Sequence, residues 1–454
     1  MWNLCLTNYH LMGKGVPIII DLFSGCGGLA LGFERAGFKI AGGIELVPEA
    51  VETVSSNLCW RYGRESDHIC ADITETDASV LKERIGPEGC IVIGGPPCQA
   101  YSRAGKAKLN SLGEDRINTS DARGYLYQDF LRFVFELDAR AVVMENVPEA
   151  TRFGEMNIPE IVSEELEAHG YDAWWTLLCA ADYGVPQVRE RLFIVGRKKE
   201  EREVYLPVPT HRDIYGYVPQ YGRQVSSFTQ YKHFRSPVKA EGDLPSWVTV
   251  GDALSDLPVL FPTEKSRYVN TPINAELPYR SSPRNTFQET MRNWYGFELY
   301  AVTGNCFRKN TRDFPIFARM KQGDLFTDAS RIADELFYKK AHDLGLKEGS
   351  PEYEKLKRQM VPIYDRNSFQ EKWQRLDENK PSHTVVAHLS FDTYSHIHPW
   401  EPRGISVREA ARLQSFPDDF SFICSMGDAF RQIGNAVPPL LAYGVAKTVI
   451  NSFK

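Results

Sequence analysis

The 454-residue sequence contains no apolar run close to the roughly 20 residues that a bilayer-spanning helix needs. Its first residues lack a basic segment followed by an apolar one, which is the pattern of an export signal. Its nine cysteines form no Cys-x-x-Cys pair. We therefore expect a cytosolic protein with reduced thiols and no membrane partner.

The sequence also lacks internal repeats, low-complexity tracts and an excess of positive charge, since its formal net charge is −6. This charge argues against a uniformly positive surface, but not against nucleic acid, because only the contact surface must be basic. Two segments are locally basic. Residues 223–239 hold four basic residues and no acid, and residues 308–321 hold five basic residues against Asp313 alone. On charge alone, both segments are interpreted as solvated loops.

Apolar runs alternate with helical patterns through the first 200 residues. Strands that are apolar throughout and separated by helices are typical of a parallel sheet covered on both faces. The sequence therefore predicts an α/β fold of the Rossmann-like kind, with helices on both faces of the sheet. The expected strands lie at residues 16–23, 39–44, 91–94, 141–144 and 192–196.

The rest of the chain is patterned differently. Residues 201–372 are rich in proline, tyrosine, arginine and asparagine and have poor periodicity, which predicts a smaller, loop-rich lobe. Regular patterning then resumes, with helices expected at 406–416 and from Pro439 onwards. We therefore expect a first domain over residues 1–200, the lobe over 201–372, and a C-terminal segment, 373–454, that completes the first domain.

A glycine-rich turn, DLFSGCGGLA, occupies residues 21–30 after the first expected strand. Its glycines allow a tight turn and a close approach to a ligand. Glu45, at the end of the next strand, could accept hydrogen bonds from both hydroxyls of a ribose. The turn also satisfies the GxGxxA dinucleotide fingerprint, so an NAD-dependent oxidoreductase and a purely structural turn both remain open. Asp72, after a third candidate strand, could accept from an adenine amino group or cap a helix.

Candidate catalytic groups follow three later strands. In residues 94–102, GGPPCQAYS, two prolines fix the backbone, so Cys98 is held at the carboxyl edge of the sheet, where α/β proteins bind ligands. Glu145 ends another expected strand. Residues 187–191, QVRER, begin the last expected strand, and alternation puts their glutamine and both arginines on one face.

A thiol, a carboxylic acid and paired guanidinium groups suit methyl transfer to cytosine. Carbon 5 of cytosine is a poor nucleophile, and a thiolate that adds to carbon 6 makes carbon 5 enamine-like. Protonated Glu145 could relieve the charge at ring nitrogen 3, while Arg191 could hold the exocyclic oxygen. Arg189 could contact a phosphate or steady the Cys98 loop. A nearby arginine would also favour the thiolate form of Cys98.

These motifs, in this order, resemble the bacterial DNA (cytosine-5)-methyltransferase family over residues 16–197 and 373–454. The resemblance implies an S-adenosylmethionine-dependent methyltransferase sheet. It also implies methyl transfer to carbon 5 of a flipped-out cytosine in a specific double-stranded DNA sequence, through a covalent Cys98 adduct. The implied catalytic residues are Cys98, Glu145, Arg189 and Arg191.

The resemblance also implies a cofactor pocket and a set of DNA contacts near the cysteine. Leu46 stands where an aromatic residue is common in the family, so weaker packing on adenine is expected. The implied DNA contacts of the cysteine loop are Gln99, Tyr101 and Ser102. The implied cofactor-binding residues are Phe23, Ser24, Gly25, Gly27, Gly28, Glu45, Leu46, Asp72, Ile73, Gly95, Pro97, Leu126, Asn435 and Val437.

In this family the middle lobe reads the DNA sequence, so the resemblance predicts that its two basic segments face phosphates. A role in capping loops only stays open. The three histidines at positions 388, 396 and 398 are interpreted as DNA-facing or core residues, and no metal is expected. The expected DNA-binding residues of the lobe are Arg308, Lys309 and Arg312, with Asn305 and Asn310 as further candidate base readers.

Double-stranded DNA is the expected partner. A cognate restriction endonuclease that acts on the same site, an orphan regulatory role and phage defence are all open as the biological context. A monomer in the bacterial cytosol or nucleoid is the default expectation. Three alternatives are open at this point: an RNA methyltransferase of the same broad family, a cysteine-dependent NAD oxidoreductase, and a DNA-binding module without activity.

Overall fold

A computed structural model describes residues 15–64, 68–97, 125–154, 156–216, 224–261, 269–362 and 372–453. By its contacts the chain divides into two compact units. The first comprises Met1–Trp247, Gln414–Phe416 and Ala436–Lys454, and the second comprises Val248–Leu413 and Pro417–Asn435. The C-terminal part of the chain therefore contributes to both units.

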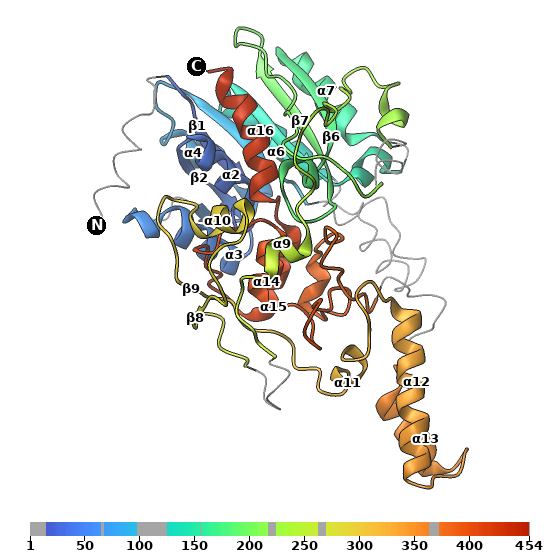
Figure 1. Cartoon of the computed structure of the whole chain (residues 1–454). Helices are drawn as coiled ribbons and strands as arrows, with labels where there is room; N and C mark the ends of the chain where they lie inside the picture. Colours follow the sequence, from blue (N-terminus) through green and yellow to red (C-terminus); the bar gives the residue numbers. More distant parts are fainter. Residues whose placement is uncertain are drawn as a thin grey trace. The chain divides into compact units, whose positions relative to one another are not determined.

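The first unit is built on a seven-stranded sheet with the strand order β3-β2-β1-β4-β5-β7-β6 (Figure 1). Neighbouring strands from β3 to β5 run parallel, whereas β7 runs antiparallel to both β5 and β6. The direction of winding reverses between β1 and β4, and open α/β sheets typically bind ligands at the carboxyl ends of the strands at such a point. The strands are β1 (Ile18–Leu22), β2 (Ile40–Glu45), β3 (His68–Cys70), β4 (Cys90–Gly94), β5 (Ala141–Asn146), β6 (Tyr171–Cys179) and β7 (Glu190–Lys198).

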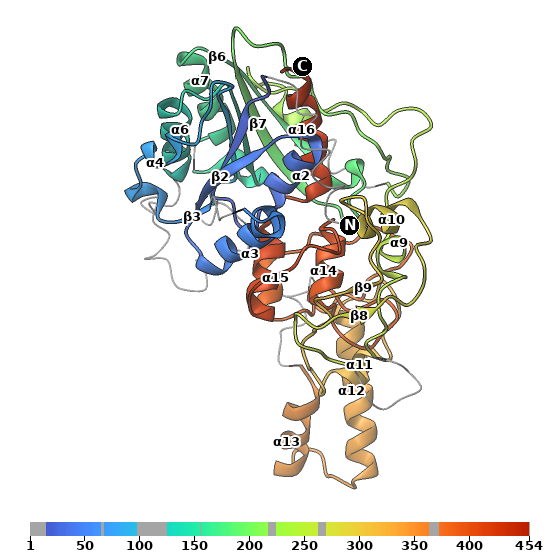
Figure 2. The same ribbon diagram turned by 90° about the vertical axis from the view of Figure 1, so that its left-hand side faces the viewer.

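Alternation along β1 divides its side chains between the two faces of the sheet. Ile18, Ile20 and Leu22 join a buried core with residues of α6 and α7, whereas Ile19 and Asp21 alternate to the opposite face. Helix α2 packs against β1, β2 and β4 and also against α16, and Figure 2 shows helices on both sides of the sheet. Continuously apolar strands require this double cover.

The helices of the first unit are α2 (Gly28–Ala36), α3 (Pro48–Leu58), α4 (Ser79–Lys82), α6 (Leu126–Glu136), α7 (Ile158–Ala168) and α16 (Pro439–Asn451). Single 3-10 turns lie at Trp60–Tyr62, Ile73–Glu75, Pro148–Arg152 and Ala180–Tyr183. The predicted α/β fold is confirmed. The sequence predicts neither the antiparallel direction of β7 nor the long strand β6. The apolar pattern of a strand does not show in which direction the strand runs.

An aromatic cluster ties the segment after β7 to the first unit. Trp175 of β6 forms a parallel bridge with Phe234, and the two ring centroids lie 4.7 Å apart. The rings of Tyr231 and Phe228 also lie against Trp175. Large aromatic surfaces that are buried together contribute strongly to such packing. This cluster explains why the first unit continues to Trp247.

The observed division therefore differs from the expected domain boundaries. Residues 201–247 pack with the first unit, and residues 373–413 and 417–435 pack with the second. The lobe expected over 201–372 thus corresponds only in part to a compact unit. Its assignment to DNA recognition stays a prediction.

The second unit has a small aromatic core and several buried ion pairs. Phe317 and Trp373 pack edge to face in this core. Arg412 is fully buried and bonds both Asp256 and Asp418, so its charge is compensated on two sides. The elements are α9 (Val250–Leu254), β8 (Leu277–Pro278), α10 (Thr286–Arg292), β9 (Ala301–Val302), α11 (Phe314–Phe317), α12 (Phe326–Asp343), α13 (Pro351–Met360), η7 (Ala387–Ser390), α14 (Val407–Leu413) and α15 (Met426–Asn435).

Candidate active site

The glycine turn between β1 and α2 is held by the carboxylate at the end of β2. Glu45 Oε2 accepts a hydrogen bond from the Gly25 amide at 2.8 Å, and Oε1 accepts one from the Val47 amide at 2.9 Å. The expected proximity of the turn and the acid is therefore present in the fold. Glu45 has a positioning role here in addition to any contact with a ribose.

Two glycines of the turn are required by packing. Gly27 has a φ of +88°, and a Cβ there would come within 2.6 Å of the Val54 side chain. A Cβ at Gly28 would come within 2.4 Å of the Val437 carbonyl oxygen. These glycines let α2 begin against α3 and against the segment before α16. Packing therefore requires glycine at both positions, whatever ligand the turn binds.

Asp72 caps a 3-10 turn after β3. Its Oδ1 accepts from the Thr74 amide at 2.9 Å and from the Thr74 hydroxyl at 2.8 Å, and these hydrogen bonds lower the pKa of the carboxyl. Ile73 beside it is buried, whereas Leu46 is 62% exposed. Both interpretations of Asp72 therefore remain compatible, since an adenine amino group can still reach its other oxygen.

Asp21 is a buried carboxyl that the sequence analysis did not single out. It is the one acidic side chain of β1 and is 1% exposed, and among the described residues neither of its oxygens has a hydrogen-bond partner. Burial, and then the charge of Glu45, raise the pKa of Asp21 well above its ordinary value. The hydroxyl of Ser24, two residues beyond the end of β1, is also buried without a partner. A charged residue inside the apolar run IIIDL was the signal that could have identified it.

At the end of β5, Glu145 and Arg191 form a buried ion pair. Arg191 Nε lies 3.0 Å from Glu145 Oε1, and both side chains are almost fully buried. Burial raises the pKa of Glu145, although Arg191 and Arg189 oppose this shift. A Cβ at Gly95 would come within 3.0 Å of Glu145 Oε2. The segment that leads to Cys98 therefore passes directly over this carboxyl.

The other expected site residues of this strand lie before it. Strand β7 begins at Glu190, so strand alternation does not apply to Gln187 and Arg189. Gln187 is fully buried and donates to the Gln414 side chain, while Arg189 is 1% exposed and donates to the Ala436 carbonyl at 3.2 Å. A buried Arg189 fits a positioning role and not a phosphate contact.

Cys98, Gln99, Tyr101 and Ser102 lie outside the residues that the structure describes. Five described cysteines are buried, and in three of them burial raises the thiol pKa: to about 12 for Cys90, to about 11 for Cys306, and higher still for Cys179. Buried thiols of this kind are poor nucleophiles at neutral pH.

The remaining expected cofactor residues lie at element ends. Phe23 is partly buried and has a φ of +54°, and Leu126 is the first residue of α6. Pro97 is the last described residue after β4. Val437 lies against Gly28 in the first unit, whereas Asn435 is exposed as the last residue of α15.

Several side chains of the two basic segments form ion pairs or hydrogen bonds within the protein, which solvated loops would not require. In the first, Lys232 pairs with Glu167 and Arg235 with Glu203. In the second, Arg308 is half-buried and donates to the carbonyls of Leu389 and Ser390.

Arg312 makes two hydrogen bonds to the carboxylate of its neighbour Asp313, at 2.6 and 3.0 Å. The candidate base reader Asn305 is buried and bonds the Val302 carbonyl. Lys309 is exposed and is therefore the best placed of the three expected DNA contacts of this segment.

Among the described residues, no group of three or more His, Cys, Asp or Glu side chains could hold a metal ion. In the same part of the chain, every helix is too short or too polar to span a membrane.

Solved structures and curated relatives match this architecture. The crystal structure of a DNA modification methyltransferase from an Escherichia coli prophage aligns with a TM-score of 0.64 and 24% identity, over 96% of this chain and 99% of that one. The type II methyltransferase M.OihORF3336P of Oceanobacillus iheyensis is 51% identical over 442 residues, which is 96% of each chain. M.AgeI of Thalassovita gelatinovora is 32% identical over 95% of this chain and 98% of its own.

The doubly wound sheet and its match to that crystal structure show the α/β fold of DNA methyltransferases. A family model for C-5 cytosine-specific DNA methylases matches residues 18–451. The chain belongs to this family and is a DNA (cytosine-5)-methyltransferase. The NAD oxidoreductase alternative is therefore excluded.

Proposed function

We propose that the protein transfers a methyl group from S-adenosylmethionine to carbon 5 of a cytosine that is flipped out of a specific duplex sequence, through a covalent Cys98 adduct. The observation that carries this proposal is the buried Glu145–Arg191 pair, which lies directly under Gly95, three residues before Cys98. Burial raises the pKa of the Glu145 carboxyl, which favours its role as a proton donor.

In the proposed reaction the Cys98 thiolate adds to carbon 6, and Glu145 gives its proton to ring nitrogen 3. Arg191 holds the Glu145 carboxyl in place and can donate to the exocyclic oxygen. After carbon 5 has received the methyl group, a base takes the proton from carbon 5, the Cys98 thiolate leaves carbon 6, and the proton on ring nitrogen 3 returns to Glu145, so that the ring double bond is restored. The buried Arg189 donates to the Ala436 carbonyl and so stabilises the segment that leads into Arg191.

The residues at the ends of β1 and β2 fit S-adenosylmethionine, which supplies an electrophilic methyl group on a sulfonium. Glu45 would bind the ribose hydroxyls, and the exposed Leu46 beside it would be covered by adenine. Asp21 lies on the same face of the sheet as Glu45 and is a buried carboxyl without a partner. A cationic ligand nearby would compensate it.

Replacement of Glu45 by alanine is expected to weaken S-adenosylmethionine binding by about 1–3 kcal/mol, because the ribose hydroxyls lose their acceptor. The amide of Gly25 also loses its partner, so the turn should become less ordered. Isothermal titration calorimetry measures the dissociation constant. Glu45→Gln keeps one acceptor and should fall between the wild type and Glu45→Ala. An unchanged constant in Glu45→Ala would contradict the assignment.

Arg308→Ala and Lys309→Ala are expected to separate folding from DNA binding. Arg308 bonds two carbonyls of the second unit, so its removal should lower the free energy of unfolding by about 1–3 kcal/mol. Lys309 is exposed, and its removal should leave stability nearly unchanged but reduce the salt slope of DNA binding by about 0.9, the value for one phosphate contact. Urea unfolding and binding titrations at several salt concentrations measure both quantities. A wild-type salt slope in Lys309→Ala would remove it from the DNA contacts.

We further propose that the biological partner is double-stranded DNA, with a restriction endonuclease that acts on the same site. The support is the similarity to relatives named as type II methyltransferases. Bisulfite sequencing of DNA from cells that express the chain tests this directly, because it reports activity and target together. Protected cytosines in one recurring sequence are expected. Methylation of transfer RNA without any protected DNA site would favour the RNA methyltransferase alternative.

A further inference from the structure

At the short turn η7 of the second unit, one aromatic side chain is exposed to solvent and a nearby leucine is buried. Phe391, directly after η7, is 70% exposed, whereas Leu389 within the turn is fully buried. A single exposed apolar residue is common on protein surfaces and by itself indicates nothing. Phe391 differs from such a residue in the hydrogen bonds that fix its backbone and in the side chains that surround its ring.

The backbone beneath Phe391 is fixed from two sides. The half-buried Arg308 donates to the carbonyls of Leu389 and Ser390, which directly precede Phe391. On the other side, η7 packs against α15, where a Cβ at Gly434 would come within 2.2 Å of the Ala387 amide nitrogen. The Phe391 amide also donates to the His388 carbonyl at 2.8 Å. An aromatic ring on so rigid a base loses little conformational entropy when it binds a partner.

Two basic side chains, Arg308 and His388, lie close to this turn. The ring of His388 lies 5.4 Å from the Phe391 ring, and its Nε2 lies 3.4 Å from Asp392 Oδ2. The other Asp392 oxygen accepts from the Tyr394 amide, so both oxygens of this acid are engaged. The exposed Lys309 follows Arg308 directly.

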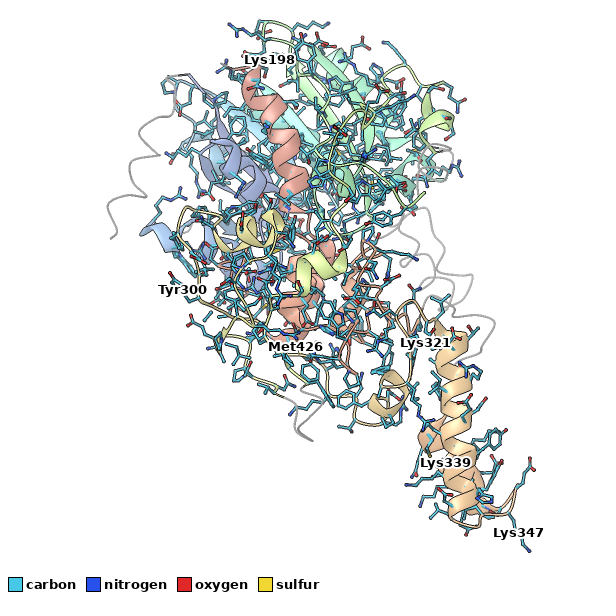
Figure 3. All side chains as sticks on the ribbon, in the orientation of Figure 1. Lys198, Tyr300, Lys321, Lys339, Lys347 and Met426 are labelled. Carbon is cyan, nitrogen blue, oxygen red and sulfur yellow. The ribbon has the colours of Figure 1, made fainter. Side chains whose placement is uncertain are left out.

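The second unit also has a cavity that is lined by the residue after Arg308. Lys309 lines a cavity of about 540 Å³, and Phe307 and Met426 are among its other walls (Figure 3 labels Met426). Lys309 at this concave surface offers a place for a phosphate, and the exposed ring of Phe391 offers a place for a base.

We propose that Phe391 inserts between neighbouring bases of the bound duplex and stacks on one of them. Apolar side chains, phenylalanine among them, insert between base steps in many complexes in which the duplex is unstacked. This inference rests on the proposed action on duplex DNA. It adds a stacking residue to that action, with Arg308 and η7 as its support and Lys309 as the neighbouring phosphate contact.

The test compares Phe391→Ala, Phe391→Trp and a matched control, Tyr300→Ala. Tyr300 is an 80% exposed aromatic residue of the same unit (labelled in Figure 3) and is not held by Arg308. The DNA is a duplex with the site that bisulfite sequencing defines, and fluorescence anisotropy measures its affinity at several salt concentrations. A 2-aminopurine placed next to the target reports unstacking.

Phe391→Ala should bind about 5- to 150-fold more weakly, with an unchanged salt slope, because stacking is not an ionic contact. Its 2-aminopurine signal should rise less on binding than that of the wild type. Phe391→Trp should bind nearly as well as the wild type, and Tyr300→Ala should bind equally well. All variants should unfold at the wild-type temperature, since both rings are exposed.

Wild-type affinity and an unchanged 2-aminopurine signal in Phe391→Ala would overturn the inference, as would an equal loss in Tyr300→Ala. A loss of affinity accompanied by a lower salt slope would also overturn it, because the ring would then act through a neighbouring charge. If the wild-type protein itself binds no duplex, the proposed function fails first, and this outcome is distinct from the failure of Phe391 alone.

Discussion

Replacement of Cys98 by alanine is expected to abolish methyl transfer, with a loss of kcat on the order of 10⁶, as for the removal of other catalytic nucleophiles. Without the sulfur, carbon 5 of cytosine is not activated and the transfer has no low-energy route. S-Adenosylmethionine affinity should stay nearly unchanged, because the Cys98 side chain is not among the proposed cofactor contacts. A radiolabelled methyl-transfer assay and calorimetric titration measure the two quantities.

Cys424→Ala is the matched control for this variant. Cys424 is a partly exposed cysteine of the second unit and should retain wild-type turnover. If Cys98→Ala keeps measurable turnover at a rate close to the wild type, Cys98 is not the nucleophile. Loss of cofactor binding together with turnover would instead indicate a damaged fold.

Replacement of Glu145 by glutamine is expected to lower kcat by about 10²–10⁴, the usual range for the loss of a general acid. Glutamine keeps the size of the side chain but has no proton to give to ring nitrogen 3. Because Arg191 Nε bonds Oε1 of Glu145, the amide can still occupy the same position. The loss should therefore appear in kcat more than in the affinity for DNA.

The pH dependence gives a second readout for Glu145. Burial raises its pKa, and only the protonated carboxyl can donate. The wild-type kcat should therefore be high below this raised pKa and fall as pH rises through it. Glu145→Gln should lack this descending limb. A Glu145→Gln profile with the same limb as the wild type would assign the titration to another group.

Much of the first unit could be predicted from sequence because its signals are local. Apolar strands, the glycine turn and the acid at the end of β2 are each defined within a few neighbouring residues, and all appear where expected. The antiparallel pairing of β7 and the long strand β6 depend on partners distant in sequence. The cluster of Trp175 and Phe234 extends the first unit past residue 200 for the same reason.

In the candidate site, too, the contacts between residues distant in sequence could not be predicted. Glu145 could be identified as a strand-end carboxylate, but its pairing with Arg191 and its cover by Gly95 required the fold. Arg308 belongs to a basic run, yet it turns inward because its carbonyl partners lie about 80 residues later in the chain. Asp21 interrupts an apolar strand in the sequence, but only the fold shows that its carboxyl is buried and has no hydrogen-bond partner among the described residues.

A duplex that carries 5-fluorocytosine at the target position tests the covalent mechanism most directly. The fluorine cannot leave as a proton does, so the enzyme should remain bonded to the DNA through Cys98 once the methyl group has been transferred. A protein–DNA band that survives denaturing electrophoresis, requires S-adenosylmethionine and disappears in Cys98→Ala is the result that we predict. A wild-type enzyme that methylates the normal duplex but never forms this band would contradict the mechanism.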